Sequence, residues 1–146
     1  MKILVDVNVF IDVLTKRANW AGSLRTLNLV RKSPEVEGWV SALTVPLLYF
    51  YRLRVVEEKQ ARTDAQAAVK GFQLVPLTQD IIDKALASAL PDFEDNIQLT
   101  SAATIAADHL ITRNKKHFQQ SLLSIMTPEE WLTLETVASL KADQQD

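Results

Sequence analysis

The apolar and polar positions of the chain alternate between strand-like and helix-like segments. Short runs that are apolar on both faces are typical of buried parallel strands. Longer segments repeat apolar residues at helical spacing, and the clearest helix start is at Thr127, with Pro128 and Glu130 behind it. Strands are expected at residues 3–5, 36–40, 72–75, 110–112 and 123–126.

Helices are expected between and after these strands. Asn8 is expected to cap the first helix, and the helix that opens at Thr44 is expected to run to about Glu58. A capping box at residues 63–66 and a cap at Thr78 predict two more helix starts. The alternation predicts an α/β domain with three layers, α/β/α, around a five-stranded, mostly parallel sheet.

Length and composition fit one globular domain. The chain has 146 residues, 47% of them hydrophobic and 23% charged. Residues 1–134 are expected to form the domain and residues 135–146 a C-terminal tail. No apolar stretch is long enough to cross a bilayer, and the run at residues 3–5 is too short for a signal peptide, so a cytoplasmic protein without membrane contact is expected.

Charge and cysteine content exclude several kinds of site. The sequence has no cysteine, which excludes disulfides and thiolate metal ligands, and two histidines make a zinc site improbable. The formal net charge of −2 gives no overall attraction to nucleic acid. RNA binding would therefore need a local basic patch or a metal ion.

Acidic and amide side chains are expected to meet at one edge of the sheet. Asp6 follows the first strand and Asn114 lies just past the fourth, where ligands of parallel sheets bind. Asp92 and Asp95 stand three residues apart at a helix start and share one face. Oxygen ligands of this kind suit Mg²⁺ or Mn²⁺, which can activate water and stabilise a leaving oxygen. Asp6, Asp92 and Asp95 are the catalytic candidates, and Asn114 joins them as a metal ligand.

Each of these residues also has a purely structural interpretation. Asp6 and Asn114 suit turns, and Asp92 suits a helix N-cap. Asp95 is favourable near the positive end of a helix dipole. Asp12, one turn into the first helix, is expected to be solvated.

The candidate contacts to nucleic acid lie mainly in one basic loop. They are Arg113, Lys115, Lys116 and His117, together with Asn8. Positive side chains here could hold an RNA backbone, and the alternative is a solvated loop.

Five segments resemble, in order, motifs of PIN domains, the family that includes VapC-type toxins. These segments are residues 6–12, 41–44, 92–96, 111–118 and 127–132. The resemblance implies the strand order 3-2-1-4-5 and cleavage of single-stranded RNA with Mg²⁺ or Mn²⁺. It also makes a small antitoxin protein a candidate partner.

The chain departs from the family pattern at two acidic positions. Leu47 stands where the family places a glutamate, and His117 stands where an acid is expected before Phe118. Asn114 would have to replace the fourth carboxylate ligand. Fewer ligand charges weaken a site for a hard cation. The two hypotheses are therefore a weakened endoribonuclease and an inactive PIN domain that binds RNA or protein.

Other folds and partners fit less well. A phospho-receiver domain would need an aspartate at the end of the third strand, where the sequence has Val75, Pro76 and Leu77. A dinucleotide-binding domain would need a glycine-rich loop after the first strand, and none is there. The apolar residues 47–51 cannot all face one core, which makes a homodimer or another partner a candidate.

Overall fold

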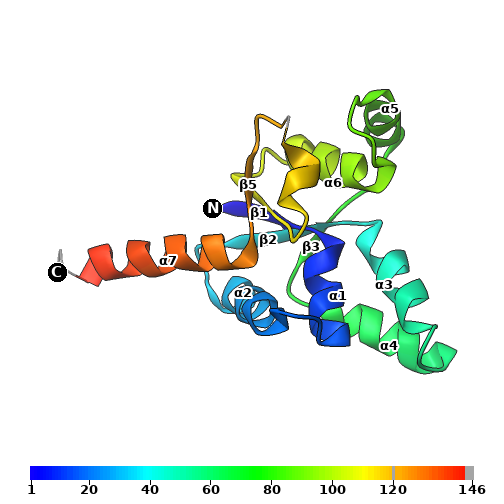
Figure 1. Cartoon of the computed structure of the whole chain (residues 1–146), viewed down its shortest axis with the longest axis horizontal. Helices are drawn as coiled ribbons and strands as arrows, with labels where there is room; N and C mark the ends of the chain where they lie inside the picture. The colour runs from blue at the N-terminus through cyan, green and yellow to red at the C-terminus, as the bar shows by residue number, and fades with distance from the viewer. Residues whose placement is uncertain (120, 144–146) are drawn as a thin grey trace.

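The chain, described here from a computed structural model over residues 1–119 and 121–143, forms an α/β fold around a single sheet (Figure 1). The strands are β1 (Lys2–Val5), β2 (Glu37–Ser41), β3 (Gln73–Val75), β4 (His109–Ile111) and β5 (Ser124–Met126). Their order is β3-β2-β1-β4-β5, and every neighbouring pair is parallel. The predicted sheet and its strand order are confirmed.

Helices fill the connections between the strands and follow the last one. They are α1 (Val7–Thr15), α2 (Trp20–Lys32), α3 (Thr44–Arg52), α4 (Glu58–Ala68), α5 (Gln79–Ala87), α6 (Phe93–Thr104), the short 3₁₀ helix η1 (Lys115–Phe118) and α7 (Pro128–Asp143). Parallel strands need such crossovers, and the helices therefore cover both faces of the sheet.

Successive side chains of β1 pack alternately into two separate cores. Ile3 and Val5 face a core shared with α1, α2, α3, α4 and the start of α7. Leu4 faces the other core, which is formed with α5, α6 and Phe118. Figure 1 shows α5 and α6 on one side of the sheet and α1 to α4 on the other. The predicted three layers are confirmed, with β1 as the central strand.

The predicted cap of the first helix is wrong. Helix α1 begins at Val7, and Asp6, with an extended backbone, occupies the N-cap position without a capping hydrogen bond from its side chain. Asn8 lies in the first turn, and its Nδ2 donates to Asp6 Oδ2 (3.3 Å). The aspartate and the asparagine are thus engaged with each other, not with the helix terminus.

The predicted long helix from Thr44 is also wrong, because two helices occupy that stretch. Helix α3 ends at Arg52, and residues 63–66 lie inside α4 and do not start it. Arg52 Nε donates to Asp64 Oδ2 (2.7 Å), which ties the two helices together across the turn. This contact joins residues of separate helices, so the local pattern of apolar and polar residues could not predict it.

Two predicted helix starts are confirmed by their hydrogen bonds. Thr127 and Glu130 form the reciprocal bonds of a capping box, at 2.9 and 3.2 Å. The Thr78 hydroxyl accepts from the Ile81 N–H at the start of α5. Helix α7 continues to Asp143, across the predicted boundary between residues 134 and 135, and residues 144–146 of the predicted tail lie outside the described part. The division into domain and tail stays a prediction.

The apolar run at residues 47–51 divides between core and surface. Leu48 is fully buried, while Phe50 is 62% exposed. This confirms that the run does not face a single core. Among the helices of the described residues, none combines the length and the apolar character that crossing a membrane requires.

Candidate functional site

Asp6 is held at the carboxyl end of the sheet by the strand beside it. Its backbone N–H donates to the Ile111 carbonyl (2.9 Å) as β1 leaves the sheet next to β4. The Thr112 hydroxyl donates to Asp6 Oδ2 (2.7 Å) and itself accepts from the Asn114 N–H (3.0 Å). The ends of β1 and β4 are therefore linked through hydrogen bonds at Asp6.

The Asp6 carboxylate is buried and only half satisfied. Its side chain is 1% exposed, and among the described residues its Oδ1 has no hydrogen-bond partner. Burial raises the pKa of Asp6 to about 6, against the lowering effect of its bonds from Thr112 and Asn8. The Asp95 and Glu94 carboxylates raise the same pKa further, which places three acidic groups in one electrostatic neighbourhood.

The start of α6 supplies the other acidic side chains. Asp92 caps this helix by accepting from the Asp95 N–H (2.9 Å), so its structural role is real. Asp95 is buried, and its Oδ2 accepts from His117 Nδ1 (2.8 Å). Burial raises the pKa of Asp95, and the hydrogen bond from His117 opposes that rise. Burial and the neighbouring Asp92 and Asp95 carboxylates also raise the pKa of Glu94.

Two of the predicted ligands fit a hard divalent cation. Mg²⁺ is often held by one or two carboxylates together with water and substrate phosphate. The unpartnered Oδ1 of Asp6, beside the buried Asp95, is an oxygen of the right chemistry. Over residues 1–119 and 121–143, however, no group of three or more Asp, Glu or His side chains is arranged to hold a metal. The ligand roles of Asp92 and Asn114 stay predictions, since Asp92 caps a helix and the contact found for Asn114 is through its backbone.

Two surface hollows adjoin the acidic groups, and the start of α6 contributes to both. The first, about 420 Å³, is lined by Asp92, Lys116 and His117 among others. The second, about 300 Å³, is lined by Glu94, Leu47 and Asn8 among others. Glu94 therefore lines the same hollow as Leu47, where the resemblance implied a glutamate. Glu94 was not among the predicted catalytic residues or metal ligands, although it lies within residues 92–96, which resemble a PIN motif.

Arg113 is committed to a network inside the protein. Its guanidinium contacts Asp12 Oδ2 (2.6 Å) and Glu129 Oε2 (2.5 Å), joining the loop after β4 to α1 and α7. It also donates to Ser23 Oγ (2.7 Å). Asp12 is 4% exposed, so the expectation that Asp12 is solvated is wrong. It is buried because a partner 101 residues away compensates its charge.

The remaining residues of the basic loop are more accessible. Lys115 Nζ lies 2.9 Å from both carboxylate oxygens of Glu130, in an exposed pair. Lys116 is exposed and lines the first hollow with His117. RNA binding by this loop stays a prediction, and these contacts favour Lys116 and His117 over Arg113.

Arg113→Ala is expected to lower the free energy of unfolding by about 2 kcal/mol, because it leaves the Asp12 charge buried without its partner. The loss stays below that for a fully buried pair because Arg113 is 17% exposed. Urea denaturation would measure it. The control Lys115→Ala breaks an exposed pair and should cost less than about 1 kcal/mol. Equal losses in the two variants would contradict a structural role specific to Arg113.

Comparison with known proteins places this chain in a family. A sequence profile described as the PIN domain matches residues 2–116. The chain belongs to the PIN domain family. Ribonuclease VapC1 of Aquifex aeolicus is 25% identical over 143 residues, which cover 91% of this chain and 97% of that protein.

Solved structures share the fold. In VapBC-1 from nontypeable Haemophilus influenzae, the matching chain has a TM-score of 0.69 at 18% identity, covering 88% of this chain and 99% of that one. A toxin–antitoxin complex from Klebsiella pneumoniae gives 0.65 at 22% identity, with 86% and 97% covered. Mycobacterium tuberculosis VapC20, described as a toxin that cleaves the sarcin–ricin loop, gives 0.56 at 13% identity, with 74% and 86% covered.

Proposed function

We propose that this PIN domain is a metal-dependent endoribonuclease that cleaves phosphodiester bonds of single-stranded RNA. The observation that carries the proposal is the buried Asp6 carboxylate, whose Oδ1 has no partner among the described residues while Asp95 and Glu94 raise its pKa. Such a group is costly unless a cation joins it. A relative named ribonuclease supports the same reaction.

The chain's own residues would prepare this site for Mg²⁺ or Mn²⁺. Asp6 and Asp95 would hold the ion, and a bound ion would supply Lewis-acid chemistry and a more acidic water. Thr112 fixes one oxygen of Asp6, and His117 fixes one oxygen of Asp95, so that each carboxylate keeps its other oxygen for a ligand. Asp92 and Asn114 belong to the proposed ligand set, and Asp92 belongs to the catalytic residues with Asp6 and Asp95.

The proposed partners follow from the relatives. A structural neighbour from Klebsiella pneumoniae is described as a toxin–antitoxin complex, which supports a small antitoxin as a partner. A cytoplasmic location is part of this proposal, because the toxin relatives and their RNA substrates suggest it. A homodimer is proposed as well, because the apolar run at residues 47–51 does not face a single core.

The test is cleavage of a fluorescent single-stranded RNA oligonucleotide by the natural protein across a Mn²⁺ titration. We expect slow cleavage that depends on Mn²⁺ and stops when EDTA removes the metal, because Asp6 and Asp95 leave few charges to hold it. The control for contaminating nuclease is Asp95→Asn, purified in the same way and checked for folding by circular dichroism.

A folded natural protein that cuts nothing at any Mn²⁺ concentration would end the nuclease proposal. Equal cleavage by Asp95→Asn would do the same, because the activity would then belong to a contaminant. The inactive PIN domain that binds RNA or protein would take its place, and Leu47 is the observation that favours it.

A further inference from the structure

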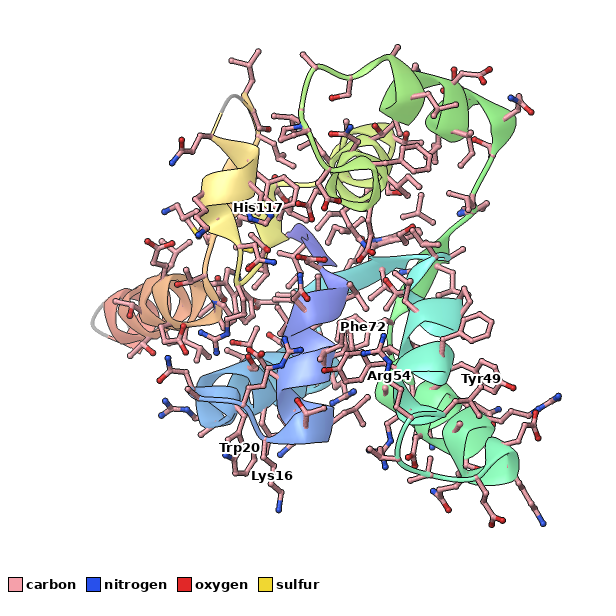
Figure 2. All side chains as sticks on the ribbon, turned by 45° about the vertical axis from the view of Figure 1, so that its right-hand side comes forward. Lys16, Trp20, Tyr49, Arg54, Phe72 and His117 are labelled. Carbon is pink, nitrogen blue, oxygen red and sulfur yellow. The ribbon has the colours of Figure 1, made fainter. Side chains whose placement is uncertain are left out.

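Two arginines and a tyrosine gather at the second hollow, away from the predicted basic loop. Arg17 follows α1, Arg54 follows α3, and Tyr51 lies in the last turn of α3. All three line the hollow of about 300 Å³ that also contains Asn8 and Glu94. Figure 2 shows Arg54 between α1 and α3, well apart from His117.

The tyrosine holds both guanidinium groups in place. Arg17 Nη2 donates to the Tyr51 hydroxyl (2.7 Å), and the Arg17 guanidinium carbon lies 5.6 Å from the ring centroid. The Arg54 guanidinium carbon lies 5.1 Å from the same centroid. Cation–π contacts of this length orient an arginine without neutralising its charge.

Neither arginine forms a salt bridge with a side chain that the structure describes, whereas Arg113, Lys115 and Arg52 do, although Glu94 lines the same hollow. Two cations at one ring repel each other, and an anion between them would relieve that repulsion. Each arginine follows the C-terminal end of a helix, where the helix dipole stabilises a positive charge. This does not explain why both arginines face one hollow.

The hollow adjoins the acidic groups through two of its lining residues. Asn8 lines it and donates to Asp6, and Glu94, on its wall, acts on the pKa of Asp6. A bound strand could therefore pass from the arginines to the carboxylates. Phe50 also lines the hollow and is 62% exposed, so an aromatic face is available there.

We propose that Arg17, Tyr51 and Arg54 form a binding subsite for the sugar–phosphate backbone of single-stranded RNA, with Phe50 as a stacking face for a base. The proposal rests on the proposed nuclease function and names where its substrate binds. Guanidinium groups match phosphate geometry. Proteins that bind single strands combine such cations with exposed aromatic rings, and a volume near 300 Å³ is within the range of ligand pockets.

The test measures RNA binding without cleavage. Fluorescence anisotropy of a labelled, unstructured RNA oligonucleotide is recorded in EDTA over a series of salt concentrations. The double variant Arg17→Ala/Arg54→Ala is expected to bind about tenfold more weakly and to lower the slope of log affinity against log salt by about 1.4, roughly 0.7 for each lost contact to a single strand. Phe50→Ala, at an exposed position, is expected to weaken binding with an unchanged salt slope.

The matched control removes the same charge elsewhere. Lys59→Ala/Arg62→Ala takes two exposed cations from α4, outside this hollow, and is expected to change affinity by less than about twofold because salt screens distant charges. Thermal melts verify that all variants fold.

Several results would overturn the proposal. These are a natural protein that binds no RNA, an Arg17→Ala/Arg54→Ala variant that keeps the natural affinity and slope, and equal losses in the α4 control. An acidic peptide of equal charge serves as a further probe, and loss of peptide binding with RNA binding intact would assign the surface to a protein partner. The binding assay needs no cleavage. If the natural protein binds RNA but does not cut it, only the nuclease function is rejected. Weaker binding by Arg17→Ala/Arg54→Ala would then still support this subsite.

Discussion

Asp6→Asn is expected to abolish RNA cleavage and at the same time to stabilise the protein at pH 7 by roughly 2–3 kcal/mol. The gain follows from the raised pKa of Asp6, about 6 in the folded chain against an ordinary value of 3.8. Every tenfold increase in the proton affinity of the folded state over the unfolded state corresponds to about 1.4 kcal/mol. An asparagine keeps an acceptor for the Thr112 hydroxyl and carries no buried charge.

The sign of the pH dependence follows from the same pKa. The folded protein binds a proton at Asp6 more tightly than the unfolded chain does, so the free energy of unfolding falls as pH rises from about 3.8 to about 6. Asp6→Asn lacks this loss. The free energies of unfolding of the variant and the natural protein should therefore be similar below about pH 4, and the full difference between them should be present above about pH 6.

Urea denaturation of both proteins in EDTA, from pH 4 to pH 7.5, would measure this difference. Asp83→Asn, at an exposed position on α5, is the matched control and should change the free energy of unfolding by less than about 0.5 kcal/mol. Mn²⁺ should stabilise the natural protein and leave Asp6→Asn unchanged, because a ligand stabilises only the state that binds it. An Asp6→Asn protein that is less stable than the natural one at pH 7 would contradict the prediction that the buried charge of Asp6 destabilises the folded protein.

The fold was predictable because its strong signals are local. The strands are short apolar runs, and the helix starts at Thr78 and Thr127 carry their own capping groups. The break between α3 and α4 was not predictable, because residues 53–57 contain no proline or glycine and the bond from Arg52 to Asp64 depends on tertiary packing. The strand order came from the family resemblance, since periodicity alone does not determine which strands pair.

The site was predictable to the extent that it lies at the strand ends. Asp6 and the loop after β4 meet there because parallel strands end at one edge. The state of Arg113 was hidden, because its partners Asp12 and Glu129 come from α1 and α7, far apart in the sequence. The contact between Arg113 and Glu129 also depends on Gly22, because a side chain at that position would collide with the Glu129 carboxylate. Arg17 and Arg54 carried no motif, and only the folded chain brings them to one ring.

Leu47→Glu is expected to increase RNA cleavage at limiting Mn²⁺ by on the order of tenfold or more, because ligand charge count sets the affinity for a hard cation. Leu47 is partly buried and lines the hollow that contains Asn8 and Glu94. A carboxylate there would join Asp6, Asp95 and Glu94 in a neighbourhood whose acidic groups already have raised pKa values. The metal-free variant should therefore be less stable than the natural protein, since like charges would repel without a cation.

Leu47→Gln is the matched control, because a glutamine side chain has nearly the same size and shape as a glutamate side chain but carries no charge. Thermal melts in EDTA and across a Mn²⁺ titration would be recorded beside the cleavage rates of both variants. Leu47→Glu should melt lower than Leu47→Gln in EDTA and gain more from Mn²⁺, since a tenfold tighter site adds about 1.4 kcal/mol at saturating metal. If both variants respond to Mn²⁺ alike, the side chain at this position does not reach the cation. If Leu47→Glu binds Mn²⁺ more tightly but cuts no faster, the side chain at position 47 limits metal binding alone, and the step that limits cleavage involves the substrate.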